Sequence, residues 1–125
     1  MSRYVFVVLT NASGGRDGEF NEWYNNQHIP DVLKIPGFVA AQRFSLAGAQ
    51  MDGATSPWQY LALYELDTDD LAGALKELAA RVGTPAMVMS DSLDMKGIGA
   101  YVFSPIAGRV VAGQAELRKA PAGGR

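Results

Sequence analysis

Residues 19–33 read EFNEWYNNQHIPDVL, and residues 35–38 read IPGF. Side chains in the first run recur at helical spacing and therefore share one face of an α-helix. They are Phe20, Trp23, Tyr24, Gln27, His28 and Asp31. Because proline lacks a backbone N–H, Pro30 predicts a kink or a restart, and Pro36-Gly37 predicts the end of the helix. The pattern indicates an amphipathic helix that carries the single histidine of the sequence near its end.

Strands are predicted on both sides of this helix. Residues 4–9 are rich in β-branched and aromatic side chains, and residues 11–18 form a connection that we expect to be flexible. Asp17, at the end of that connection, is expected to cap the helix. Residues 38–46 read as a second strand, and residues 58–66 read as a third, after a connection rich in glycine, alanine and serine.

A second helix is predicted after Thr68, which we expect to be its cap. The buried stripe of this helix consists of Leu71, Leu75, Leu78 and Val82, and Gly83 with Pro85 ends it. We expect residues 86–93 to form a short extra helix and residues 98–103 to form the last strand.

The resulting order, βαββαβ, is typical of a ferredoxin-like α+β fold. In that fold both helices lie on one face of a four-stranded antiparallel sheet. A chain of 125 residues fits one domain. We expect this domain to span residues 1–108 and residues 109–125 to form a loose C-terminal tail, because large apolar side chains are scarce there.

The other face of such a sheet is left uncovered. Alternation in the third strand places Trp58, Tyr60 and Tyr64 on one side, and we expect that side to be the uncovered one. A large apolar patch on a small protein calls for a partner. Pairing of two identical chains through their sheets is the simplest closed solution, so the sequence predicts a homodimer.

Composition narrows the class of protein. The net charge of −2 argues against a nucleic-acid partner. No apolar run approaches the ~20 residues of a membrane span, and no signal peptide begins the chain, so we expect a cytoplasmic protein without a membrane partner. With no cysteine and one histidine, we expect neither a metal site nor a cofactor.

The run F-x-x-W-Y-x-x-x-H-x-P-D-V-L-x-x-P-G-F at residues 20–38 resembles the EthD-like branch of the dimeric α/β-barrel superfamily. The likeness extends from Arg3 to about Ile106. It implies a ferredoxin-like protomer that forms a dimeric α/β barrel through its sheets. Relatives include cofactor-independent monooxygenases, polyketide cyclases, dehydratases and muconolactone isomerases, beside many proteins without an assigned activity. In EthD-like relatives the histidine before the proline is suspected of activity, and that position is His28 here.

His28 is the leading catalytic candidate, because imidazole can accept and return a proton near neutral pH. Asp31 is a second candidate, since it could orient the ring. The residues predicted to contact a substrate are Tyr24, Tyr60, Tyr64, Tyr101 and Arg43. Each has a structural alternative: the tyrosines as core or interface groups, and Arg43 as the ion-pair partner of Glu65 or Asp91. For His28 the alternative is a half-buried ring that bonds a backbone carbonyl.

These observations predict a cofactor-independent enzyme that acts on a small apolar cyclic or aromatic molecule. A lone acid–base group suits lyase, isomerase or cyclase chemistry, and a cofactor-free monooxygenase is a further possibility. The competing hypothesis is a non-catalytic dimer that binds a hydrophobic small molecule, or an accessory protein. The enzyme hypothesis requires that His28 borders an open cavity, whereas the binding hypothesis is favoured if its ring is sealed.

Overall fold

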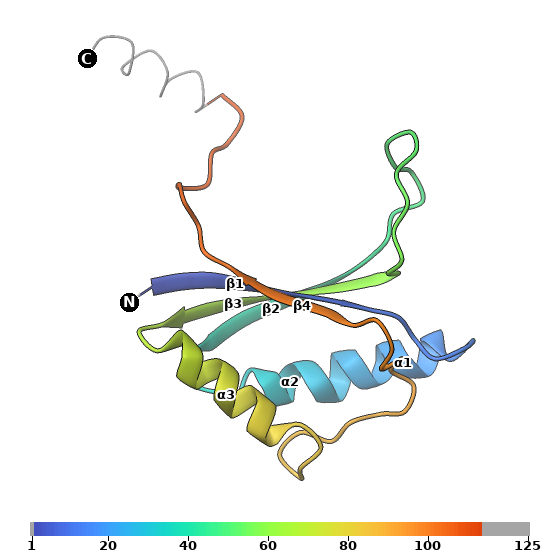
Figure 1. Ribbon diagram of the computed structural model, residues 1–125, viewed down its shortest axis with the longest axis horizontal. Coiled ribbons are helices and arrows are strands. Elements are labelled where there is room, and N and C mark those ends of the chain that lie inside the picture. The colour runs from blue at the N-terminus through green and yellow to red at the C-terminus, as the bar shows by residue number, and fades with distance from the viewer. Residues whose placement is uncertain (1, 114–125) are drawn as a thin grey trace.

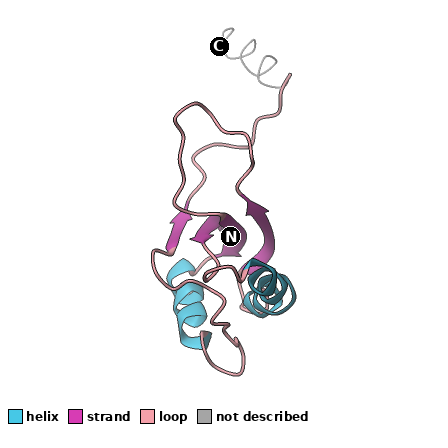
Figure 2. Cartoon of the chain, turned by 90° about the vertical axis from the view of Figure 1, so that its right-hand side faces the viewer, coloured by secondary structure: helices cyan, strands magenta, loops and turns pink. Residues whose placement is uncertain are grey.

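The computed structural model describes residues 2–113 and has the predicted α+β architecture. Its elements are β1 (Ser2–Thr10), α1 (Asp17–Trp23), η1 (Tyr24–His28), α2 (Ile29–Val32), β2 (Phe38–Ser45), β3 (Tyr60–Thr68), α3 (Leu71–Arg81) and β4 (Gly99–Phe103). The strands form one antiparallel sheet in the order β2-β3-β1-β4. The helices lie on one side of this sheet and leave the other side bare (Figures 1 and 2). The predicted βαββαβ order is therefore confirmed.

The register of the sheet decides which side chains meet the helices. Tyr64 lies opposite Phe6 on β1 and opposite Ala41 on β2, and directly paired residues of antiparallel strands share a face. Tyr64 is buried, and its hydroxyl contacts that of Tyr24 on the helical layer. The prediction that Tyr60 and Tyr64 lie on the uncovered face was wrong. Alternation separates two faces of a strand, but it does not say which of them the helices cover.

Trp58, the third residue of that prediction, precedes β3 and lies in the connection between β2 and β3. Its indole Nε1 donates a 2.6 Å hydrogen bond to the carbonyl of Gly97. This bond gives the N–H of the partly buried indole an acceptor and holds Trp58 against the segment that precedes β4.

The core fills the space between the sheet and the helical layer. Its buried members are Phe20, Tyr24, Val32, Ile35, Phe38, Ala62, Tyr64, Leu66, Ala74, Met87 and Leu93. The predicted stripe of the second helix is only partly buried: Leu71, Leu75 and Leu78 pack against this core, whereas Val82 is 44% exposed at the helix end.

The uncovered face carries the complementary set of side chains. Val7 pairs with Leu63 and Tyr101, and these residues share the face turned away from the helices. Tyr101 and Phe103 on β4 are 57% and 54% exposed, and Phe44 on β2 is 45% exposed. An apolar uncovered face exists as predicted, but it is made by the opposite set of residues.

Two helix caps differ from the predicted ones. Arg16, not Asp17, is the cap residue of α1, and Asp17 is the first residue of that helix. Asp70, not Thr68, caps α3, because its carboxylate accepts the N–H of Gly73 at 2.9 Å. The hydroxyl of Thr68 instead accepts the N–H of Asp70.

The short helix predicted at residues 86–93 does not form. These residues belong to an irregular segment, residues 83–98, that we call the strap. Within it the hydroxyl of Ser90 accepts the backbone N–H of Ser92 at 3.1 Å, a local bond that competes with a helix. The strap also pairs with the connection after β1 through an isolated bridge between Ala12 and Leu93. The connection predicted to be flexible is thereby tied to the strap.

Within residues 2–113, no helix combines the length and the apolar character that a membrane span requires. Of the predicted C-terminal tail, residues 114–125 lie outside the described residues.

Candidate functional site

The helical run that opens the sequence argument contains a π-helical turn. This turn, η1, spans Tyr24–His28, and the N–H of Ile29 bonds back to the carbonyl of Tyr24, five residues earlier. Pro30 follows immediately. Since proline cannot donate and its ring crowds the carbonyl four residues before it, a widened turn lets the helix continue through this point. Pro30 thus leads to a π-turn in place of a sharp kink, and His28 lies at the end of that turn.

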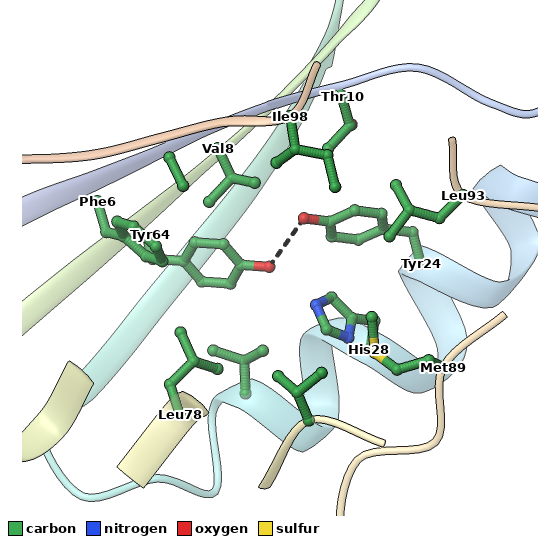
Figure 3. Close-up of a pocket in the computed structure, with 13 residues that line it drawn as sticks. Phe6, Val8, Thr10, Tyr24, His28, Tyr64, Leu78, Met89, Leu93 and Ile98 are labelled. Atoms are coloured by element: carbon green, nitrogen blue, oxygen red, sulfur yellow. Dashed lines mark hydrogen bonds between the residues drawn. The ribbon is translucent and has the colours of Figure 1, made fainter. Parts of the chain in front are cut away.

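His28 borders a cavity of about 140 Å³ between the sheet, the helices and the strap (Figure 3). The lining residues are Phe6, Val8, Thr10, Tyr24, His28, Val32, Tyr64, Leu78, Val82, Met89, Leu93, Ile98 and Ala100. Nine of these thirteen are aliphatic, phenyl or thioether side chains, so the polar groups are few. They are the imidazole of His28, the hydroxyls of Tyr24 and Tyr64, and the hydroxyl of Thr10.

Aromatic contacts hold the imidazole of His28 in place. The indole of Trp23 stacks on it with ring centroids 4.8 Å apart, and the ring of Tyr24 meets it edge-on at 4.9 Å. Trp23 is itself fixed, because its Nε1 donates to the carbonyl of Val88 in the strap at 3.0 Å. The Nδ1 atom of His28 is buried and has no hydrogen-bond partner.

The pKa of His28 is lowered to about 4, mainly by burial; the charge of Asp31 opposes this shift, and the charge of Arg43 adds to it. At neutral pH the imidazole is therefore uncharged, and one of its nitrogens is a proton acceptor.

Tyr24 and Tyr64 place two phenol groups beside this imidazole. The hydroxyl of Tyr64 donates to that of Tyr24 at 3.2 Å, and both side chains are buried. Burial raises the pKa of each phenol, so both remain protonated at neutral pH. Because Tyr24 already accepts from Tyr64, its own proton is available to an oxygen atom in the cavity (Figure 3).

Arg43 does not form the predicted ion pair with Glu65 or Asp91. Its guanidinium donates to the side-chain oxygens of Asn21 and Asn25, each at 2.8 Å. Asp91 instead binds Arg16 at 2.7 Å. The reason is the register: Arg43 lies on the helix-covered face of β2, whereas Glu65 lies on the uncovered face of β3.

The guanidinium of Arg43 lies 4.4 Å from the ring centroid of Tyr24. Arg43 does not line the cavity itself, but it packs against the ring of Tyr24, which does.

The remaining predicted residues lie outside the cavity. Tyr60 donates its hydroxyl proton to Asp17 at 2.6 Å, and Tyr101 lies on the uncovered face of the sheet. Asp31 is buried, and its carboxylate accepts from Gln27 at 2.8 Å and lies 3.7 Å from the Nζ atom of Lys34. Asp31 thus reaches His28 by its charge and not by a hydrogen bond.

Sequence reasoning missed the strap as a wall of the cavity. Met89, Leu93 and Ile98 line it, although they belong to a segment without regular structure. No periodic pattern marks such residues. The apolar side chains of residues 86–93 were the available signal for this wall, but their pattern led to the prediction of a short helix.

Among residues 2–113, no group of three or more histidine, cysteine, aspartate or glutamate side chains is arranged to hold a metal ion. The polar side chains at the cavity, His28, Tyr24, Tyr64 and Thr10, can transfer protons and form hydrogen bonds.

The fold and the cavity define a ferredoxin-like α+β protein with a mostly apolar cavity on the helical side of its sheet. Comparison with models of protein families and with the sequences of curated proteins gives no match. Two solved structures are similar. One is an EthD (ethyl tert-butyl ether D) family protein from Bacillus halodurans, with 17% identity over 85% of this chain and 100% of the other, and a TM-score of 0.49.

The second structure is a protein described as a "putative monooxygenase" from Shewanella loihica. The two sequences are 15% identical, and the match spans 86% of this chain and 99% of the other, with a TM-score of 0.56. At this identity the likeness shows a shared fold. The ferredoxin-like α+β fold that the resemblance of residues 20–38 implies is the fold observed, and the second structure shares it.

Proposed function

We propose that this protein is a cofactor-independent enzyme that transfers protons on a small, mostly apolar cyclic or aromatic molecule, with His28 as general acid and base. The observation that carries the proposal is the position of His28: an uncharged imidazole borders a cavity whose other walls are apolar apart from three hydroxyls. An aqueous base would be hydrated, whereas this one meets its guest with little competing water.

The reaction begins when the unprotonated nitrogen of His28 takes a proton from a carbon next to a carbonyl group of the guest. The electron pair of that C–H bond moves toward the carbonyl oxygen, which becomes an enolate. The hydroxyl of Tyr24 donates to this oxygen, and Tyr64 supports Tyr24 by donating to it. The imidazolium then returns the proton at a second position, which completes an isomerisation, or protonates a leaving hydroxyl group, which completes a dehydration.

The protonated state of His28 is short-lived, because its low pKa makes the imidazolium a strong acid. Asp31 lies near enough for its charge to favour that state. A cofactor-free monooxygenase would use the same first step, since a carbanion of a suitable guest can react directly with dioxygen.

The size of the cavity limits the guest. An apolar cavity of about 150 Å³ is known to hold a single benzene ring, and the cavity here is about 140 Å³. Single-ring compounds with one or two oxygen atoms are therefore the first candidates, and larger guests require movement of the strap.

The test is a turnover screen of single-ring enolisable ketones and lactones with wild type, His28→Ala and His28→Gln. Loss of turnover by at least a hundredfold in both variants, with unchanged folding, supports the proposal. Asn26→Ala is the matched control, because Asn26 lies in the same π-turn and is exposed. Wild-type turnover in His28→Gln would remove His28 from the mechanism.

A non-catalytic binding protein is the second candidate. Two observations favour this candidate: Trp23 stacks on the ring of His28, and the pKa of that ring is low. A weak base that is held in place by an aromatic neighbour is a poor proton acceptor. This candidate predicts that ring compounds bind the protein without being converted, and that His28→Gln changes affinity alone.

We also propose that the protein is a homodimer joined through the uncovered faces of two sheets. The exposed apolar side chains of this face, among them Phe44, Tyr101 and Phe103, support it. The residues that line the cavity lie on the opposite face, so each protomer would carry its own cavity.

A further inference from the structure

Arg43 is a partly buried cation without a carboxylate partner in the described part of the chain. Its two terminal nitrogens bond the neutral amide oxygens of Asn25 and Asn21, and its Nε atom is buried without a hydrogen-bond partner. The ion pairs present in residues 2–113 involve Arg3, Arg16, Lys34 and Arg81 instead. The positive charge of Arg43 is therefore not neutralised at short range.

This charge is directed at the wall of the cavity. The Arg43 guanidinium carbon lies 4.4 Å from the centroid of the Tyr24 ring, 5.3 Å from that of Phe20 and 5.6 Å from that of Tyr60. Of these three rings, Tyr24 alone lines the cavity. Aromatic rings screen a charge far less than water does, so the field of Arg43 extends to the Tyr24 hydroxyl.

At the phenols of Tyr24 and Tyr64 no carboxylate of the described residues cancels this field, whereas at His28 the charge of Asp31 outweighs it. Asp17, on α1, accepts the hydroxyl proton of Tyr60 at 2.6 Å. Asp31, on α2, accepts from Gln27 and lies beside Lys34. Arg43 lowers the pKa of the phenols of Tyr24 and Tyr64 and also that of His28. Its charge thus favours negative charge in the cavity and disfavours positive charge.

We propose that Arg43 is a positioning residue that acts through Tyr24, so that the cavity selects guests whose oxygen carries or develops negative charge, namely weakly acidic ring phenols and enols. This inference rests on the proposed function, because it names the substrate class of the same cavity. The guest oxygen accepts a hydrogen bond from Tyr24, and Arg43, behind the ring of Tyr24, stabilises the resulting anion.

The test uses 2,4,6-trifluorophenol, a single-ring phenol whose fluorine NMR shift reports whether it is ionised. On ionisation its O–H bond breaks, the electron pair stays on oxygen and the proton passes to the buffer. The pKa of the bound phenol is measured in wild type and in Arg43→Gln. We expect it to be about one unit higher in Arg43→Gln, as expected from removing a charge several ångströms away at intermediate dielectric.

Three variants separate this effect from a structural one. Arg43→Lys keeps the charge and should retain most of the wild-type value. Tyr24→Phe keeps the ring but loses the donor, so it should raise the pKa of the bound phenol as Arg43→Gln does. Lys76→Gln removes one positive charge from an exposed position of α3 and should have no effect.

The possible failures are distinguishable. Equal pKa values of the bound phenol in wild type and Arg43→Gln would overturn this inference and leave the cavity proposal intact. So would equally tight binding of 1,3,5-trifluorobenzene, which has the same ring without the hydroxyl. If neither ring compound binds, both the proposed function of the cavity and the inference about Arg43 fail.

Discussion

At the scale of single residues, His28 is defined by what surrounds it rather than by its chemistry alone. Trp23 covers one face of its ring, Tyr24 meets its side, and the cavity takes up the space beyond. Desolvation by these neighbours outweighs the favourable charge of Asp31. The imidazole is consequently uncharged at neutral pH, and this is the form that proton abstraction requires.

This environment predicts a pH dependence of stability. The pKa of His28 is about 4 in the folded protein and 6.5 in the unfolded chain. Because the folded value is the lower one, the unfolded state binds more protons between these values, and stability falls as the pH falls from 6.5 towards 4. We expect His28 to account for a loss of about 2 kcal/mol between pH 7.5 and pH 5.

Urea unfolding of wild type and His28→Gln at the two pH values measures this contribution. The loss of stability in the variant should be smaller than that in wild type by the stated amount. Identical losses in the two proteins would show that the ring is hydrated in the folded state.

At the scale of elements, the π-turn and the helix caps locate the functional groups. His28, at the end of the π-turn, lines the cavity. Leu78 on α3 and Val82, which directly follows α3, line another part of its wall. The start of α3 depends on Asp70, whose carboxylate accepts the N–H of Gly73. An added Cβ at Gly73 would stand 2.1 Å from that carboxylate, so a larger residue there would displace the capping side chain.

Removal of this cap should destabilise the protein measurably. Asp70→Ala is expected to lower the free energy of unfolding by about 1 kcal/mol, whereas Asp70→Asn keeps a capping oxygen and should cost much less. Asp52→Ala, at an exposed position in the connection between β2 and β3, controls for the loss of a carboxylate. The measurement is the urea midpoint of each variant, and equal effects of the two Asp70 variants would contradict the capping role.

At the scale of the whole molecule, the sheet divides the protein into a side that carries the cavity and a side that the helices leave bare. The cavity lies on the side of the sheet that the helices and the strap cover. No helix covers the other side among the described residues (Figure 1). Arg3 lies 3.8 Å from Glu65 and from Asp67 at one end of that face, and these charged residues would form a polar rim around the apolar centre.

The proposed dimer is tested by a charge placed at the centre of the bare face. Leu63→Glu should weaken association at least tenfold, because a carboxylate would be buried without a partner. Ala79→Glu, at an exposed position of α3, should leave association unchanged. Sedimentation velocity over a range of concentrations distinguishes the two. A wild-type protein that sediments as a monomer at all concentrations would refute the dimer.

Much of this architecture could be predicted from local patterns. Residues 4–9, 38–46 and 98–103 were predicted as strands and lie within one or two residues of β1, β2 and β4, because β-branched and aromatic runs favour extended backbone. The importance of His28 as a candidate also came from sequence. The partners of Arg43 and the strap at residues 83–98 could not be predicted, since both depend on contacts between segments far apart in the chain.

The amino-acid sequence by itself determined the order of the elements, an interruption of the helix near Pro30 and the presence of one imidazole among aromatic residues. These features follow from short-range spacing and backbone sterics. The tertiary structure alone decided which face of β3 meets the helices, and with it that Tyr64 joins Tyr24 and His28 while Leu63 is left outside. The physical reason is that period-two alternation is symmetric between the two faces, and only packing against a particular helix distinguishes them.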